Sequence, residues 1–209
     1  MSGQDYKIYK MNVVFGLKAH SGWAALVALG NDGHGFTVVD RSRLELVEEE
    51  WAKQPYHAAE ELEPKKARDV VKRGIDAAHR IARRELKVAL KRERDRGNKV
   101  VACAVLVGNP MPDWSVEQIL AVHFRMHQAE GVLFREALIA AAKANELNLV
   151  ALPEKTLLQE AEQSLGTPAS ELLKTVSALG KSAGPPWGKD QKDAALAALV
   201  AFKLEAVEL

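Results

Sequence analysis

The chain has 209 residues, of which 47% are hydrophobic and 27% charged, and its 29 Lys and Arg nearly balance its 28 Asp and Glu. This composition is that of a globular protein, and it argues against a disordered chain or a strongly basic nucleic-acid binder. The single cysteine, Cys103, excludes an internal disulfide, and its apolar neighbours predict a core position. No membrane-spanning stretch and no secretory signal is apparent, so we expect a cytoplasmic protein with one domain over residues 1–209.

The first half of the chain has the pattern of strands followed by a helix. Short aliphatic runs at 13–17, 23–29 and 36–40 are separated by small-residue turns, the second of them at 31–35. Over 68–96 the apolar residues recur every three or four positions, which predicts a long amphipathic helix. We therefore expect three antiparallel strands and then this helix.

The second half alternates strands and helices. A nearly continuous apolar run at 100–107 is typical of a strand covered on both faces. Ser115 and Gln118 form a capping box at the start of a second long helix. We expect a helix at 115–145, a strand at 147–152 and helices at 154–165, 168–180 and 190–206. Thr167 caps the helix at 168–180, and Pro168 is its first residue. This order predicts an α/β fold of the ribonuclease H-like type, with a mixed five-stranded sheet and helices on both faces.

Two aspartates open the last predicted helix. Asp190 and Asp193 follow the Gly/Pro-containing loop 182–188. Carboxylates three residues apart project from one face of a helix, where they can hold a divalent ion between their oxygens. The alternative is that Asp190 is only an N-cap and that Asp193 is favoured by the helix dipole. Both interpretations remain open from the sequence.

The second half of the chain resembles the Holliday-junction resolvases of the RuvC type. His127-Gln128-Ala129-Glu130-Gly131-Val132 is similar to the Q-A-R-G-V helix of that family, and Asp190-Gln191-Lys192-Asp193-Ala194-Ala195-Leu196 is similar to its D-x-x-D-A-L ending. The first strand matches only in outline. Lys18 stands at the position of the first catalytic aspartate of the family, and the place of its second acid, at 105–108, has no carboxylate.

The resemblance implies the ribonuclease H-like fold, but the residues that differ argue against nuclease activity. In the family, four carboxylates hold two magnesium ions that activate water and stabilise the leaving oxygen of a phosphodiester. An ammonium in place of one ligand repels such an ion, at a cost of several kcal/mol in a buried site. We expect Lys18 to occupy the space of the metal and to pair with Asp190 or Asp193, so that magnesium is a cofactor only if the site has been rebuilt.

The long predicted helix is basic. The segment 65–96 carries thirteen Lys or Arg against five Asp or Glu, and such a face can follow a phosphate backbone by counterion release. The candidate nucleic-acid contacts are Arg80, Arg83, Arg84, Lys87 and Lys91. The preceding segment 45–63 holds seven glutamates and one lysine, so the two segments can instead neutralise each other within one molecule or across a homodimer.

Several other residues have an ordinary structural interpretation. His20 and Ser21 are expected in a turn, Glu130 on a solvated helix face, and Gly131 at a close helix contact. His123 and His127 are four residues apart on one helix face and could share a metal, but the sequence indicates no third ligand.

Three hypotheses follow. The first is a RuvC-like protein with a degenerate nuclease site that acts by binding DNA, RNA or a protein partner. The second is a magnesium-dependent, structure-specific endonuclease in which Asp190 and Asp193 are joined by an acid from elsewhere, such as Glu130 or Asp40. The third is a structural or oligomeric module held together by the basic and acidic segments.

Overall fold

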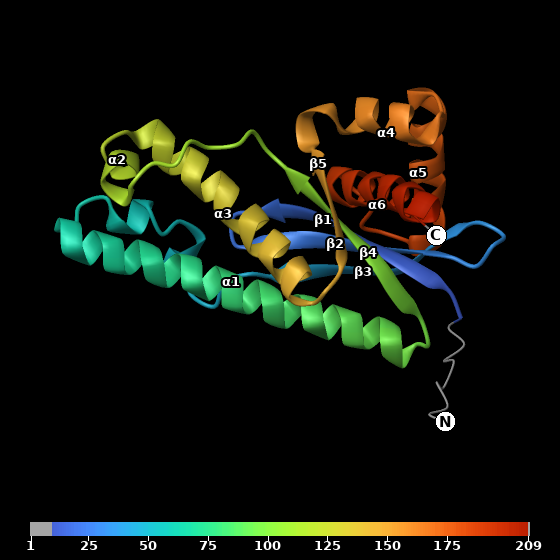
Figure 1. Cartoon of the computed structure of the whole chain (residues 1–209), viewed down its shortest axis with the longest axis horizontal. Helices are drawn as coiled ribbons and strands as arrows, with labels where there is room; N and C mark the ends of the chain where they lie inside the picture. Colours follow the sequence, from blue (N-terminus) through green and yellow to red (C-terminus); the bar gives the residue numbers. More distant parts are fainter. Residues whose placement is uncertain (1–9, 209) are drawn as a thin grey trace.

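The computed structural model describes residues 10–208, and its centre is a mixed five-stranded sheet (Figure 1). The strands lie in the order β3-β2-β1-β4-β5. The antiparallel pairs are β1 with β2 and β2 with β3, whereas β4 runs parallel to both β1 and β5. The bounds are β1 (Asn12–His20), β2 (Trp23–Asn31), β3 (Phe36–Glu45), β4 (Lys99–Val107) and β5 (Asn148–Pro153). The five-stranded mixed sheet expected from the sequence is confirmed.

Helices cover both faces of the sheet (Figure 1). One face carries α1 (Pro64–Asp95) and α3 (His123–Ala144), and the other carries α6 (Lys189–Glu208) with α4 (Leu157–Leu165) and α5 (Ala169–Ala183) around it. Short pieces complete the chain: α2 (Val116–Leu120) and the 3₁₀ helices η1 (Glu50–Lys53), η2 (His57–Ala59) and η3 (Glu154–Thr156). Each helical layer has its own apolar core against the sheet, as expected of a three-layer α/β protein.

Helix α6 packs on the sheet more closely than an ordinary helix. All residues of the Ala-rich stretch 194–201 are buried, because the sheet lies beneath them and α4 and α5 lie against the other side. A Cβ added to Gly16 of β1 would come within 1.8 Å of the carbonyl oxygen of Ala194. The missing side chain of Gly16 therefore lets the α6 backbone rest directly on β1.

Several boundaries differ from the sequence-based expectation, among them β3, which continues to Glu45, and α4, which starts at Leu157. The second long helix is broken at Val122, whose extended backbone separates α2 from α3 and lets Ile119 and Met126 enter the same small apolar cluster. Helix α5 starts one residue after Pro168 and continues past Gly180. The glycine is tolerated because the indole of Trp187 fills the space that its Cβ would need.

The capping box predicted at Ser115 and Gln118 is confirmed at the start of α2. The hydroxyl of Ser115 accepts a hydrogen bond from the backbone N–H of Gln118, and the amide oxygen of Gln118 accepts one from the N–H of Ser115. Cys103 is fully buried in β4, and burial raises the pKa of its thiol to about 12, as expected of a core residue. Among the described residues, no helix is both long and apolar enough to span a bilayer.

Candidate functional site

The candidate site lies at one edge of the sheet, where β1, β4 and β5 all end. These strands are mutually parallel, so their carboxyl ends share this edge, which is a common place for sites in α/β proteins. Lys18 lies near the end of β1, two residues beyond Gly16 and therefore on the face that α6 covers. The close contact at Gly16 thus brings the first turn of α6 over the Lys18 side chain.

The ammonium of Lys18 lies among three carboxylates. Its Nζ donates a hydrogen bond of 2.7 Å to Oδ2 of Asp193, and it lies 3.1 Å from Oε1 of Glu154 and 3.3 Å from Oδ1 of Asp190. The Lys18 side chain is only 5% exposed, whereas the three carboxylates are 20–27% exposed. The sequence led us to expect that Lys18 pairs with Asp190 or Asp193, and in the structure it pairs with both.

Further basic groups surround these carboxylates. Lys189 donates to Oδ2 of Asp193 at 2.5 Å, and Arg135 donates to Oε2 of Glu154 at 3.0 Å. The three carboxylates are thus matched by three permanent cations, Lys18, Lys189 and Arg135. The cluster carries no excess negative charge with which to attract a metal ion.

His20 also approaches this cluster. Its Nε2 lies 3.1 Å from Oδ2 of Asp190, without the alignment of a hydrogen bond, and its ring stacks on Trp23 with centroids 4.3 Å apart. The sequence had suggested that His20 lies in a turn, but it is the last residue of β1. The stacking holds the imidazole beside the aspartate.

The ion pairs change the protonation behaviour of both Lys18 and Glu154. Burial alone would lower the pKa of Lys18, but hydrogen bonds and charge attraction from Asp193 and Glu154 outweigh it and raise that pKa. Burial alone would raise the pKa of Glu154, but Lys18 and Arg135 outweigh it and lower that pKa. Both groups are therefore held in their charged forms at neutral pH.

The start of α6 is fixed by the loop before it. The guanidinium of Arg41 donates to the carbonyl oxygens of Gly184 and Pro185, at 2.6 and 2.9 Å, and Trp187 Nε1 donates to the Val176 carbonyl at 3.0 Å. The backbone N–H of Gly188 is capped by the side chain of Gln191. These contacts hold the first turn of α6 against β1.

The interpretation of Asp190 as an N-cap is wrong. Helix α6 begins at Lys189, so Asp190 lies inside the first turn and its carboxylate faces Lys18 and His20. A carboxylate in the first turn still benefits from the helix dipole.

Glu154 is the member of the cluster that sequence analysis missed. The resemblance placed a second acid at the end of β4, where the buried Leu106 stands opposite Leu152 of β5. The structure supplies a carboxylate from the next strand along, directly after Pro153. Glu154 could have been predicted from its position directly after a parallel strand, because ligands bind at the edge of the sheet where such strands end.

The two acids suggested for a rebuilt metal site lie elsewhere. Asp40 faces α1, where Arg92 and Arg96 lie 3.3 and 3.8 Å from its carboxylate oxygens. Glu130 is buried rather than solvated, and it accepts hydrogen bonds from His57. Neither carboxylate is free to join Asp190 and Asp193.

The carboxylate cluster does not fit magnesium in this arrangement. Mg²⁺ requires oxygen ligands at about 2.0–2.1 Å in octahedral geometry. Here the space between Glu154, Asp190 and Asp193 is taken by the ammonium of Lys18, which donates a hydrogen bond to Asp193 and forms ion pairs with the other two carboxylates. An ion could enter only by displacing a buried, paired cation.

A cleft of about 590 Å³ opens beside the cluster. Arg135, Lys155 and Lys189 line it, together with Glu154 and one face of α3 that includes Gly131. Gly131 is exposed, and an added Cβ would meet only Arg135, at 3.6 Å, so the expected close helix contact at this glycine is wrong.

The basic face of α1 is partly neutralised within the chain. Arg80 and Arg84 both pair with Glu48, at 3.1 and 2.7 Å, and Lys91 pairs with Asp95. Arg83 and Lys87 are exposed and have no ion-pair partner within residues 10–208. Nucleic-acid contact by this face stays a prediction.

The sheet order and its covering helices define an α/β fold of the ribonuclease H-like type, and solved structures share it. The chain is similar to RuvC of Thermus thermophilus, at 15% identity with a TM-score of 0.51, and the match covers 94% of this chain and 96% of RuvC. It is equally similar to T. thermophilus RuvC in complex with Holliday junction substrate, at 15% identity and a TM-score of 0.51, over 93% and 96% of the two chains. No protein-family model matches the sequence, and neither does any curated protein. At this identity the likeness establishes the fold.

Proposed function

We propose that this chain is a RuvC-like protein that binds branched nucleic acid through a degenerate nuclease site and does not cleave it. The observation that carries the proposal is the position of Lys18, whose Nζ lies 2.7–3.3 Å from Glu154, Asp190 and Asp193. A fixed ammonium can neutralise the three carboxylates and so allow a phosphate to approach. It cannot lower the pKa of a bound water as a divalent metal does.

The cleft beside the cluster is the surface that we assign to the ligand. Lys155 and Lys189 are exposed at its wall, and Arg135 is held there by Glu154. Phosphate contacts of Lys and Arg give affinity without sequence preference. The likeness to a RuvC bound to a Holliday junction supplies the substrate class to test first.

The experiment is fluorescence anisotropy with a labelled four-way DNA junction, carried out in EDTA over a range of salt concentrations. The proposal predicts binding without metal, with an affinity that falls as salt rises. The double change Lys155→Glu and Lys189→Glu is expected to weaken binding and to lower the salt slope by about 1 per lost phosphate contact. Lys174→Glu, an exposed lysine of α5 outside the cleft, is the matched control and is expected to bind like the unmodified protein.

The same assay tests the basic face of α1. If that face contacts nucleic acid together with the cleft, Arg83→Glu with Lys87→Glu will also reduce the salt slope; if it does so in place of the cleft, only this variant will reduce it, which would contradict the assignment of the cleft. Binding that neither double variant changes, or that requires a divalent metal, would contradict the proposal.

A metal-dependent nuclease is the second candidate. The observation in its favour is that Glu154 adds a third carboxylate to Asp190 and Asp193, which is a richer set of oxygen ligands than the sequence alone indicated. This candidate requires Lys18 to leave the cluster when metal binds. Its buried position and raised pKa make that exchange costly.

A purely structural or oligomeric module has less support. Its motivation was charge pairing between α1 and the preceding acidic segment. Arg80 and Arg84 already pair with Glu48 of the same chain, so no second copy is needed to neutralise that part of the helix. A monomer in sedimentation would remove this candidate.

A further inference from the structure

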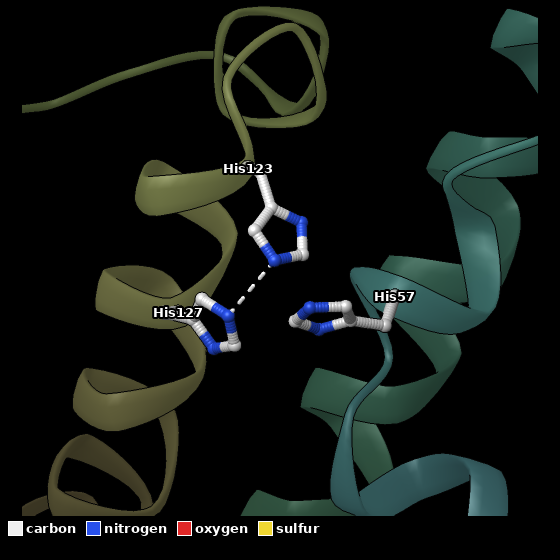
Figure 2. A group of neighbouring side chains, drawn as sticks. All are labelled: His57, His123 and His127. Atoms are coloured by element: carbon white, nitrogen blue, oxygen red, sulfur yellow. Dashed lines mark hydrogen bonds between the residues drawn. The ribbon is translucent and has the colours of Figure 1, made fainter.

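Three histidines outside the Lys18 cluster converge on one point. His123 and His127 project from successive turns of α3, and His57 reaches toward them from η2 (Figure 2). One ring nitrogen of each lies within 4.8 Å of one ring nitrogen of the other two. The third ligand, which the sequence did not indicate, is thus His57, from a segment far from α3 in the chain.

The nitrogens of His123 and His127 are spaced much as two ligands of one metal ion are, and that of His57 lies within 4.8 Å of both. Nε2 of His123 and Nε2 of His127 lie 3.1 Å apart. Two imidazole nitrogens bound to one tetrahedral zinc at about 2.0–2.1 Å lie about 3.3 Å from each other. Two lone pairs cannot face each other at such a distance unless a proton or a cation lies between them.

A buried carboxylate orients the third histidine. Oε2 of Glu130 lies 2.8 Å from Nδ1 of His57, and Oε1 accepts a hydrogen bond from the His57 backbone N–H at 3.2 Å. Because an ionised carboxylate only accepts hydrogen bonds, it favours the proton on Nδ1 of His57, and in the neutral imidazole Nε2 then has the lone pair that a metal needs. A carboxylate on the outer nitrogen of a metal-binding imidazole is the usual supporting arrangement.

A second carboxylate lies near His123, beyond hydrogen-bond distance. Oε1 of Glu60 lies 3.8 Å from Nδ1 of His123, on the opposite side of that ring from its Nε2. The backbone on both sides is also held by packing, because Tyr56 and Ala59 of the η2 region and Met126 and Ala129 of α3 belong to one apolar cluster. The two halves of the site are therefore positioned before any ion arrives.

We propose that His57, His123 and His127 form a binding site for a zinc-class divalent transition metal. Imidazole ligands select this class, whereas magnesium and calcium prefer oxygen. The His123 side chain is 64% exposed, so the fourth coordination position is open to solvent, as in zinc sites that hold a water or a ligand. His127 also lines the cleft beside the Lys18 cluster, so a bound ion would lie at the rim of that cleft.

The test is a zinc titration by isothermal calorimetry on protein that carries no histidine tag, with Co²⁺ as a spectroscopic probe. The site predicts one saturable zinc ion per chain and the visible absorption of four-coordinate cobalt. His123→Ala and His127→Ala, both at exposed positions, are expected to abolish both signals without changing the thermal midpoint of the metal-free protein. His34→Ala removes an exposed histidine from the turn after β2 and is expected to bind like the unmodified protein.

Glu130→Gln tests the role assigned to the buried carboxylate. We expect it to weaken zinc binding about 10- to 100-fold while the stoichiometry stays at one. Two results would overturn the proposal. If the unmodified protein gives no saturable zinc binding, His123 and His127 share a proton instead. If zinc binding is unchanged in both alanine variants, the metal binds elsewhere.

Discussion

Lys18 is a buried cation whose charge is stabilised by carboxylates rather than by water. Desolvating an ammonium costs several kcal/mol, and here the cost is offset by Glu154, Asp190 and Asp193 together. The carboxylates in turn depend on Lys18, because without it three negative charges would share a partly buried space. The four side chains are therefore one coupled unit.

Removing the ammonium is expected to destabilise the fold. Lys18→Met keeps the aliphatic length but leaves three carboxylates with only Lys189 and Arg135 as cations, and the loss of one member of a buried pair costs up to about 3–5 kcal/mol. The partial exposure of the carboxylates reduces this figure. Lys189→Met makes the same chemical change at a 76% exposed side chain, and its ion pair with Asp193 is expected to contribute only about 0.3–0.5 kcal/mol. Equal free energies of unfolding for the two variants, measured by urea denaturation, would disprove the coupling.

The depressed pKa of Glu154 makes stability depend on acidity. The folded-state pKa lies below the ordinary value of 4.5, so the contribution is fully present above that pH and is lost as the pH falls through the folded-state pKa. The raised pKa of Lys18 has no effect there, since that group stays charged until strongly alkaline pH. We expect the free energy of unfolding to fall more steeply below about pH 4.5 in the unmodified protein than in Glu154→Gln. Parallel pH profiles would contradict the assigned ion pair.

The contact of α6 with β1 is what brings the aspartates over Lys18. Gly16→Ala would place a Cβ against the carbonyl oxygen of Ala194, a backbone atom that can move only with the helix. We expect a loss of about 1–3 kcal/mol, the usual cost of overpacking.

The matched control is Gly131→Ala in α3. Its new Cβ would make only an ordinary contact with Arg135, so the higher helix propensity of alanine is expected to stabilise the protein by about 0.5–1 kcal/mol. The two changes thus have opposite expected signs in thermal denaturation. A Gly16→Ala midpoint at or above that of the unmodified protein would show that α6 is not anchored at this point.

Hydrophobic periodicity predicted the elements better than their ends or their contacts. The five strands and the long helices follow from apolar patterns that are local in sequence. The break at Val122 does not, because it depends on an apolar cluster that Tyr56 and Val71 build from other parts of the chain. Gly131 was misread for the same reason, since a glycine in a helix pattern does not reveal which neighbour, if any, lies against it.

The same limit applies to the site. Lys18, Asp190 and Asp193 could be brought together from the sequence because a resemblance supplied the spatial relation that the spacing alone does not contain. Glu154 was missed because it corresponds to no residue of the motifs that carried the resemblance. It lies in the cluster because it follows β5, which is parallel to β4. His57 was missed because a 3₁₀ segment of low periodicity carries it to α3.

Over the whole molecule, charge is arranged in compensated groups rather than in one basic surface. The acidic segment before α1 offsets part of that helix, and three cations offset the carboxylates at the sheet edge. Among residues 10–208, the basic groups outside these ion pairs include Lys155 at the cleft and Arg83 and Lys87 on α1. Both places can attract a phosphate backbone, which is why the cleft and α1 variants are compared in one binding assay.

The central claim is that an ammonium occupies the position of a metal ion at the sheet edge. Its most direct test is a calorimetric titration with Mg²⁺ and Mn²⁺, with cleavage of a four-way junction followed in parallel. The parent protein carries His123→Ala, so that the histidine cluster does not contribute, and it is compared with the same protein carrying Lys18→Asp. We predict little heat and no cleavage for the parent, and a higher metal affinity for Lys18→Asp, which adds a carboxylate beside Glu154, Asp190 and Asp193. Metal-dependent cleavage by the parent that Asp193→Asn abolishes would contradict the claim and establish a nuclease.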